Sequence, residues 1–314
     1  MAAQEFPPTD FPVTDSGFIR AVKDCVSGTV GGIVQVLTGQ PFDTVKVRLQ
    51  TQPLPAPGQP PLYTGMADCV KKTLQKEGWT GFYKGTVTPL VGIGACVSIQ
   101  FVVLEHMKRR FRAQNHGLPF TNTQLYIAGA ASGLANSVVS GPVEHIRTRL
   151  QVQTGSGTSA QYSGPVDAIR KIYREHGLFR GIYKGQAVTM VREFQGYGAY
   201  FLSYEYLVRE TMASSRLKHR NEIPTWKVCA FGAVAGYAMW LTVYPVDVIK
   251  SKIQTNGFTA ATRAYNSAWD CVVKTWRKEG MKGFFRGFGP CILRAAPVNA
   301  ATFVGFEAAM RVLN

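Results

Sequence analysis

One short motif occurs three times at nearly equal spacing, and this repetition restricts the chain to folds built from three equivalent units. The motif reads proline, any residue, acid, two residues, base, and its copies cover residues 41–46, 142–147 and 245–250. A glutamine follows each copy. Later in each unit, an aromatic residue is followed by a base and a glycine, at 83–85, 183–185 and 285–287. The markers keep the same order and predict repeats at residues 18–118, 119–220 and 221–314, after a flexible tail at 1–17.

Composition favours a membrane protein. Charged residues make up 17% of the chain, below the quarter or so that is usual for soluble domains, and 46% of the residues are hydrophobic. The net charge of +16 suits a nucleic acid, an anionic lipid or an anionic solute. Since no run of about 18 residues is free of both charged and polar side chains, we expect helices whose polar faces line a watery cavity. A basic helical-repeat protein that binds nucleic acid is a remote alternative, because the bases alternate with acids inside the motifs.

Each unit contains the same series of segments: a glycine-rich helix, the motif, a polar stretch with a short amphipathic helix, and a second apolar helix. Two membrane-spanning helices per unit predict an all-α membrane protein with six transmembrane helices. Short surface helices are expected at 66–75, 166–174 and 268–277. Glycines spaced four apart in the first helices predict close helix contact, at Gly28 and Gly32, Gly129 and Gly133, and Gly232 and Gly236.

The sequence carries no sign of a metal, a cofactor or an enzyme. The six cysteines form no CxxC pair and no zinc-type spacing with histidine. We find no nucleophile motif, no metalloprotease motif and no paired-carboxylate motif. Residues 1–17 contain three acids and no base, which is unlike a signal or transit peptide, so we expect any organelle address to be internal.

These motifs resemble the signature of the mitochondrial carrier family over nearly the whole chain. The resemblance implies a monomeric six-helix barrel with threefold pseudosymmetry in the mitochondrial inner membrane, which moves a small solute by alternating access. It also implies that a lipid, cardiolipin, binds with its phosphates at the starts of three helices. The residues expected there are Lys84, Gly85, Lys184, Gly185, Arg286 and Gly287.

The chemistry of the motif suits a gate, on the matrix side according to the resemblance. Prolines can bend the helices toward one axis, at Pro41, Pro142 and Pro245. Acids and bases from different helices can then pair, with Asp43, Glu144 and Asp247 facing Lys46, Arg147 and Lys250. Exposed pairs contribute only about 0–1 kcal/mol each, which suits a latch that solute binding must open. The resemblance adds a bracing role for Gln50, Gln151 and Gln254.

The family pattern for the opposite, cytoplasmic-side gate is an aromatic residue, an acid, two residues and a base. Glu105 and Lys108 nearly complete it, whereas Glu205 and Glu307 have Val208 and Met310 at the basic position. The sequence therefore predicts a weak latch on this side.

A solute is asymmetric, so its site should lie where the repeats differ. The same step beyond each anchor glycine reaches Gly92, Arg192 and Arg294, deep in the second helices, and Glu193 adjoins Arg192. Charges at such depth are functional by default. Arginines can hold a carboxylate while Glu193 receives an ammonium, which describes a zwitterion such as a small amino acid.

Two other solutes remain open. Carnitine or an acylcarnitine also combines a cation with a carboxylate. We expect Gly92 to leave its contact position empty and apolar. A basic amino acid is disfavoured because Gly92 supplies no second carboxylate. We expect His145 to be structural, and Tyr197, Tyr200 and Tyr204 to pack or line the barrel rather than bind a base.

Overall fold

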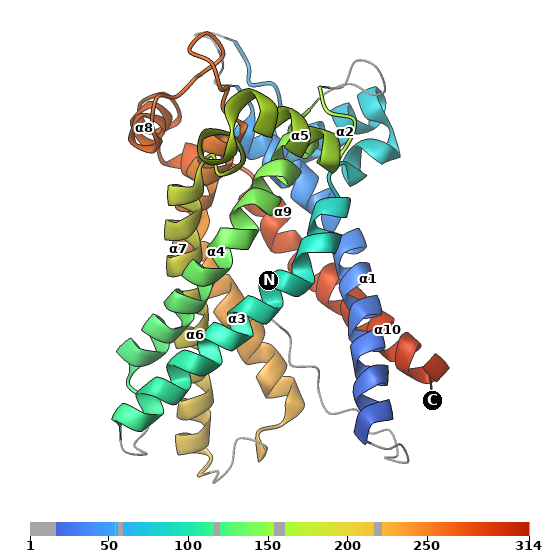
Figure 1. Cartoon of the computed structure of the whole chain (residues 1–314), viewed down its shortest axis with the longest axis vertical. Helices are drawn as coiled ribbons and strands as arrows, with labels where there is room; N and C mark the ends of the chain where they lie inside the picture. Colours follow the sequence, from blue (N-terminus) through green and yellow to red (C-terminus); the bar gives the residue numbers. More distant parts are fainter. Residues whose placement is uncertain are drawn as a thin grey trace. The chain divides into compact units, whose positions relative to one another are not determined.

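The computed structural model describes residues 17–53, 55, 59–115, 120–153, 161–216 and 222–313, which contain helices and no strand (Figure 1). The prediction of an all-α protein is confirmed. The expected tail lies outside the described residues apart from Gly17, where the first helix begins. The elements are α1 (Gly17–Thr51), α2 (Met66–Glu77), η1 (Trp79–Tyr83), α3 (Val87–Gln114), α4 (Asn122–Val152), α5 (Pro165–His176), η3 (Leu178–Ile182), α6 (Gln186–Ser214), α7 (Thr225–Thr255), α8 (Ala268–Phe284), α9 (Phe288–Leu293) and α10 (Ala295–Leu313).

The long helices are long enough to cross a membrane. Helix α1 has 35 residues, or about 52 Å at 1.5 Å per residue, against a hydrocarbon core of about 30 Å. In the third repeat the second long helix is divided into α9 and α10 at Arg294. Among the described residues, the stretches Trp79–Gln114 and Trp226–Thr255 also pass a test of hydropathy for membrane spans. Each motif proline lies inside its helix, at Pro41 in α1, Pro142 in α4 and Pro245 in α7.

The backbone itself carries the threefold repeat. Two glycines in each repeat adopt positive φ. The first follows the surface helix, or in the third repeat lies at a kink inside α8, and the second lies just before α3, α6 or α9. Gly78 (φ 65°) and Gly85 (φ 78°) are the pair of the first repeat. A side chain at either position would be strained, which explains why both glycine columns recur in the sequence.

The three surface helices form as the sequence predicts and begin with the same network of contacts. In α2, the carboxylate of Asp68 accepts hydrogen bonds from Lys72 and from the backbone N–H of Thr64, and both hold the pKa of Asp68 below its ordinary value. Lys72 also donates to the carbonyl of Leu62. Asp167 and Asp270 have the equivalent lysine partners, at 2.9 and 2.8 Å, and the same lowered pKa.

The chain divides into two compact units, which we describe separately. Unit 1 comprises residues 1–91, 146–171 and 286–314, and unit 2 comprises 92–145 and 172–285. In unit 1, α1 packs against α10, α9, η1 and α2. In unit 2, α7 packs against α6 and α8.

The predicted close helix approach at glycines is confirmed in α4 and is wrong at Gly32 of α1 and Gly236 of α7. A Cβ at Gly133 would lie 2.4 Å from the carbonyl oxygen of Glu193, so the backbones of α4 and α6 touch. Nothing lies within 4 Å of a Cβ at Gly32 or Gly236. In α1 it is the adjacent Gly31 that faces α10, because one residue turns a helix surface by about 100°.

Candidate functional site

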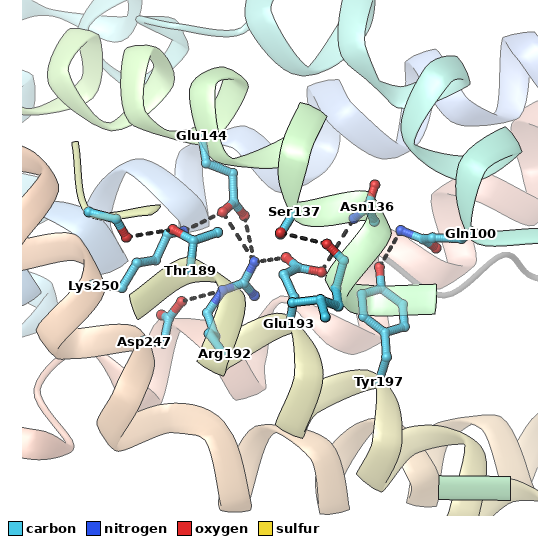
Figure 2. Close-up of polar contacts among 12 residues, drawn as sticks. Gln100, Asn136, Ser137, Glu144, Thr189, Arg192, Glu193, Tyr197, Asp247 and Lys250 are labelled. Atoms are coloured by element: carbon cyan, nitrogen blue, oxygen red, sulfur yellow. Dashed lines mark hydrogen bonds and ion pairs between the residues drawn. The ribbon is translucent and has the colours of Figure 1, made fainter. Parts of the chain in front are cut away.

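Arg192 is the centre of a buried charge cluster in unit 2 (Figure 2). Its Nη2 atom lies 3.0 and 3.1 Å from the two carboxylate oxygens of Glu144 on α4. The same nitrogen also donates to the carboxylate of Glu193, and Nε lies 3.8 Å from Asp247 on α7. Three helices therefore each place a carboxylate against one guanidinium.

One predicted gate pair lies in the same cluster. Lys250 on α7 approaches Glu144 on α4 with 2.5 Å between Nζ and Oε2. The pair joins the motifs of the third and second repeats, and both side chains are at least partly buried. Glu144 is consequently shared by a motif base, Lys250, and by a predicted solute ligand, Arg192.

A second gate pair lies in unit 1. Arg147 Nη2 is 2.8 Å from Asp43 Oδ2, which joins the motifs of the second and first repeats. Arg294 reaches the same carboxylate, with Nε 3.4 Å from Oδ1. Gly39 leaves space for this contact, because a Cβ there would lie 3.3 Å from Arg294 Nε. The third expected pair, Lys46 with Asp247, involves different units and stays a prediction.

The predicted solute ligands and the predicted gate are therefore linked. Both site arginines contact motif acids, Arg192 in unit 2 and Arg294 in unit 1. The spacing of residues in the sequence does not reveal this link, because it does not show which way a long side chain extends. A carboxylate that binds either arginine has to compete with a gate carboxylate.

Near Glu193 lie polar residues that the repeat pattern does not single out. The side chain of Glu193 is 3% exposed and accepts a hydrogen bond of 3.3 Å from Asn136 Nδ2 on α4. Beside it, Gln100 donates to the hydroxyl of Tyr197 at 2.6 Å, while Ser132 donates to the backbone carbonyl of Gln100. One sequence pattern does indicate them: on one face of α4, the polar residues Ser132 and Asn136 lie beside the close-contact glycine Gly133.

The motif glutamines are buried, and two of them have threonine partners. Gln151 Nε2 lies 3.4 Å from Thr44 Oγ1 and Gln254 Nε2 lies 3.4 Å from Thr189 Oγ1. Their brace on the gate pairs, and that of Gln50, stays a prediction. A different glutamine, Gln40, accepts a hydrogen bond from Arg147 and donates one to the carbonyl of Lys84. Gln40 precedes the motif proline, where the other repeats have no glutamine.

Gly92 does not leave an empty contact position, which corrects the expectation from the sequence. A Cβ there would lie 3.0 Å from Val143 Cγ1, so a valine of α4 fills the space. The position is apolar, as expected, but it is closed.

At the positions expected for the cytoplasmic-side gate, a cross-helix pair links two residues of unit 2. Lys108 Nζ lies 3.5 Å from Glu205 Oε1. Glu105 pairs with Arg109 and Glu307 pairs with Arg311, each within its own helix and largely exposed. These contacts fit the incomplete pattern in the sequence.

Buried basic residues at a further equivalent position of the repeats were not predicted from the sequence. Arg48 lies 2.7 Å from Glu77, and both side chains are less than 5% exposed; Lys252 and Glu279 form the equivalent pair at 3.2 Å. In the second repeat His176 stands in the acid's place. The sequence pattern that indicates these buried bases is a second basic residue two positions after the base of each motif.

His145 behaves as expected. It is fully buried, and its Nδ1 lies 3.0 Å from the carbonyl of Ile182. A carbonyl oxygen only accepts, so Nδ1 carries the proton. Thr44, at the same motif position, donates to the carbonyl of Phe82 in the same way.

A basic cavity of about 890 Å³ lies where α6 begins. Lys184 donates there to the carbonyls of Asn256 and Gly257 and lies 4.1 Å from the centre of the Phe258 ring. Its lining also includes Gly185, His176, Arg180, Arg263, Asn266 and Ser267. Lys84, the counterpart of Lys184, instead forms an ion pair with Glu77 at 2.5 Å.

The chain is similar to known proteins over almost its full length. The sequence model of the family described as mitochondrial carrier protein matches residues 18–115, 119–214 and 221–314. A glutamate/glycine mitochondrial carrier of Schizosaccharomyces pombe is 52% identical, with 94% of this chain and 96% of that protein covered. A mitochondrial glycine transporter of Saccharomyces cerevisiae is 48% identical (94% and 92%), and the human mitochondrial carnitine/acylcarnitine carrier protein is 38% identical (94% and 96%). The chain is a multi-pass solute transporter of the mitochondrial inner membrane and belongs to the mitochondrial carrier family.

Proposed function

We propose that the protein exchanges a small amino acid across the inner membrane by alternating access, as a monomer and without covalent chemistry. The observation that carries this proposal is the sharing of Arg192 among the carboxylates of Glu144, Glu193 and Asp247. A solute carboxylate can replace one of them without leaving the guanidinium unpaired, and unpaired buried charge is what makes such exchanges costly.

The adjacent glutamate supplies the second half of the recognition. When a solute carboxylate replaces the carboxylate of Glu193 on Arg192, Glu193 is released to bind a cation. An amino acid carries both charges on neighbouring atoms, so it matches an arginine and a glutamate at consecutive positions of one helix. Arg294 as a further ligand of the same solute stays a prediction, because it belongs to the other unit.

Two relatives named for glycine, or for glutamate and glycine, make these amino acids the first candidates. The relative named for carnitine and acylcarnitine supports the second candidate, since 38% identity extends over the same length. Both solutes contain a cation and a carboxylate, and the charge cluster alone does not distinguish them.

Exchange in liposomes tests the proposal. Purified protein is reconstituted into liposomes loaded with unlabelled glycine, and the initial uptake of labelled glycine, glutamate and carnitine is measured against protein-free liposomes. We expect glycine or glutamate to enter several times faster than carnitine. Uptake of carnitine with neither amino acid would overturn the proposal.

We also propose that an anionic lipid, cardiolipin, binds in the cavity at Lys184 and Gly185. The cavity combines a lysine, two arginines and the amino end of α6, which are groups that bind phosphate. The same role for Gly85, Arg286 and Gly287 stays a prediction. Lys84 is less suited, because Glu77 already neutralises its ammonium.

A further inference from the structure

The buried amide of Asn136 has an unused acceptor beside the charge cluster. The residue is 2% exposed, and its Nδ2 donates to Glu193 Oε2 at 3.3 Å. Its Oδ1 atom has no hydrogen-bond partner among the described residues. Buried polar atoms in proteins are nearly always paired, so an orphaned acceptor next to a functional carboxylate calls for a ligand that donates.

The three repeats differ at this position. Counted back from the motif proline, Asn136 corresponds to Gln35 in the first repeat and Met239 in the third. A residue needed only for the repeated fold would recur in all three, as the neighbouring glycine column does with Gly32, Gly133 and Gly236. A residue that recognises an asymmetric solute need occur only once.

We propose that Asn136 determines specificity by accepting a hydrogen bond from the cationic nitrogen of the solute, while Glu193 neutralises its charge. The inference rests on the proposed function and narrows its substrate class to zwitterions that carry at least one N–H on the cation. A quaternary ammonium, as in carnitine, has no N–H and leaves Oδ1 unpaired.

The geometry allows both groups to act on one nitrogen. Oδ1 and Nδ2 belong to the same amide, so the unpaired acceptor lies beside the atom that already contacts Glu193 Oε2. A solute cation bound by Glu193 can therefore direct an N–H group to Oδ1. A primary ammonium has three N–H groups and satisfies both, whereas methyl groups on the nitrogen satisfy neither.

An N-methyl series of one amino acid isolates this contact. Glycine, N-methylglycine, N,N-dimethylglycine and trimethylglycine keep the carboxylate and the positive nitrogen, and lose the N–H groups one at a time. Each is measured as an inhibitor of labelled glycine exchange in liposomes that contain the purified protein. In the wild type, we expect inhibition to weaken about 10- to 100-fold between the dimethyl and trimethyl compounds, where the last donor is lost.

Variants show whether Asn136 causes that step. Asn136→Leu has no acceptor, so we expect the loss of inhibition between the dimethyl and trimethyl compounds to shrink to about threefold or less. Asn136→Asp keeps acceptor oxygens and is expected to show the full loss. Asn122→Leu, at the exposed start of the same helix, is the matched control and should behave as the wild type. The same series is also measured as the rise in unfolding temperature that each compound gives the purified protein in detergent, which needs binding but no transport.

The outcomes separate this inference from the function on which it rests. A wild-type protein that exchanges carnitine and no glycine refutes the proposed function. A wild type that exchanges glycine but shows no step at trimethylglycine refutes the inference alone. The inference also fails if Asn136→Leu keeps the full step, or if Asn136→Leu and Asn136→Asp lose it equally, because the amide would then be purely structural.

Discussion

Replacement of Arg192 by alanine is expected to lower amino-acid exchange by about 100-fold or more. Truncating one partner of a buried charge pair typically costs about 2–5 kcal/mol in binding, and each 1.4 kcal/mol is a factor of ten. Here the loss is at the high end, because Arg192 faces the carboxylates of Glu144, Glu193 and Asp247. The measurement is initial uptake of labelled glycine into liposomes that contain equal amounts of folded protein.

Two further variants identify the cause of this loss. Arg192→Lys keeps the charge but not the planar fork, so we expect activity between that of the wild type and that of Arg192→Ala. Arg209→Ala, on the same helix with its guanidinium 3.5 Å from Asn122 Oδ1, should exchange normally. Wild-type rates in Arg192→Ala would remove this residue from the site.

Glu77→Gln is expected to destabilise the folded protein by about 3–5 kcal/mol, the usual cost of removing one partner of a buried ion pair. Glu77 binds Arg48 at 2.7 Å and Lys84 at 2.5 Å, and its side chain is 4% exposed. The measurement is the unfolding temperature in detergent. Asp68→Asn removes a solvent-accessible pair with Lys72 in the same helix, and should leave the unfolding temperature nearly unchanged.

Lowering the pH should lower the unfolding temperature, as the substitution Glu77→Gln does. Burial alone would raise the pKa of Glu77, but hydrogen bonds from Arg48 and Lys84 hold it below the ordinary value of 4.5. A carboxylate with a lowered pKa stabilises the folded state fully above its unfolded pKa and loses this contribution as the pH falls through the lowered value. Unfolding temperature should therefore drop below about pH 4.5, and drop less in Glu77→Gln. Identical acid profiles for the two proteins would contradict this assignment.

The sequence predicted those features that depend on local spacing. The surface helices and the motif prolines inside helices both follow from patterns that recur three times. Two cross-helix pairs, Arg147 with Asp43 and Lys250 with Glu144, were likewise expected from acid and base at fixed positions of one motif.

The features that the sequence did not predict depend on how helices are rotated and how far side chains reach. Gly31 rather than Gly32 faces α10, a difference of one residue that periodicity does not fix. Arg192 reaches Glu144 across 48 positions of sequence, and Asn136 meets Glu193 only because α4 and α6 touch at Gly133. Such contacts arise from tertiary packing, and no spacing rule contains them.

The claim on which the account depends is that the cluster around Arg192 and Glu193 binds the solute. The most direct test is the unfolding temperature of purified wild type, Glu193→Gln and the exposed same-helix control Glu210→Gln, each with and without glycine or glutamate. At about 100 times the dissociation constant, a bound solute should stabilise the wild type and the control by roughly 2.7 kcal/mol, and leave Glu193→Gln unchanged. An equal rise in all three proteins would place the solute elsewhere.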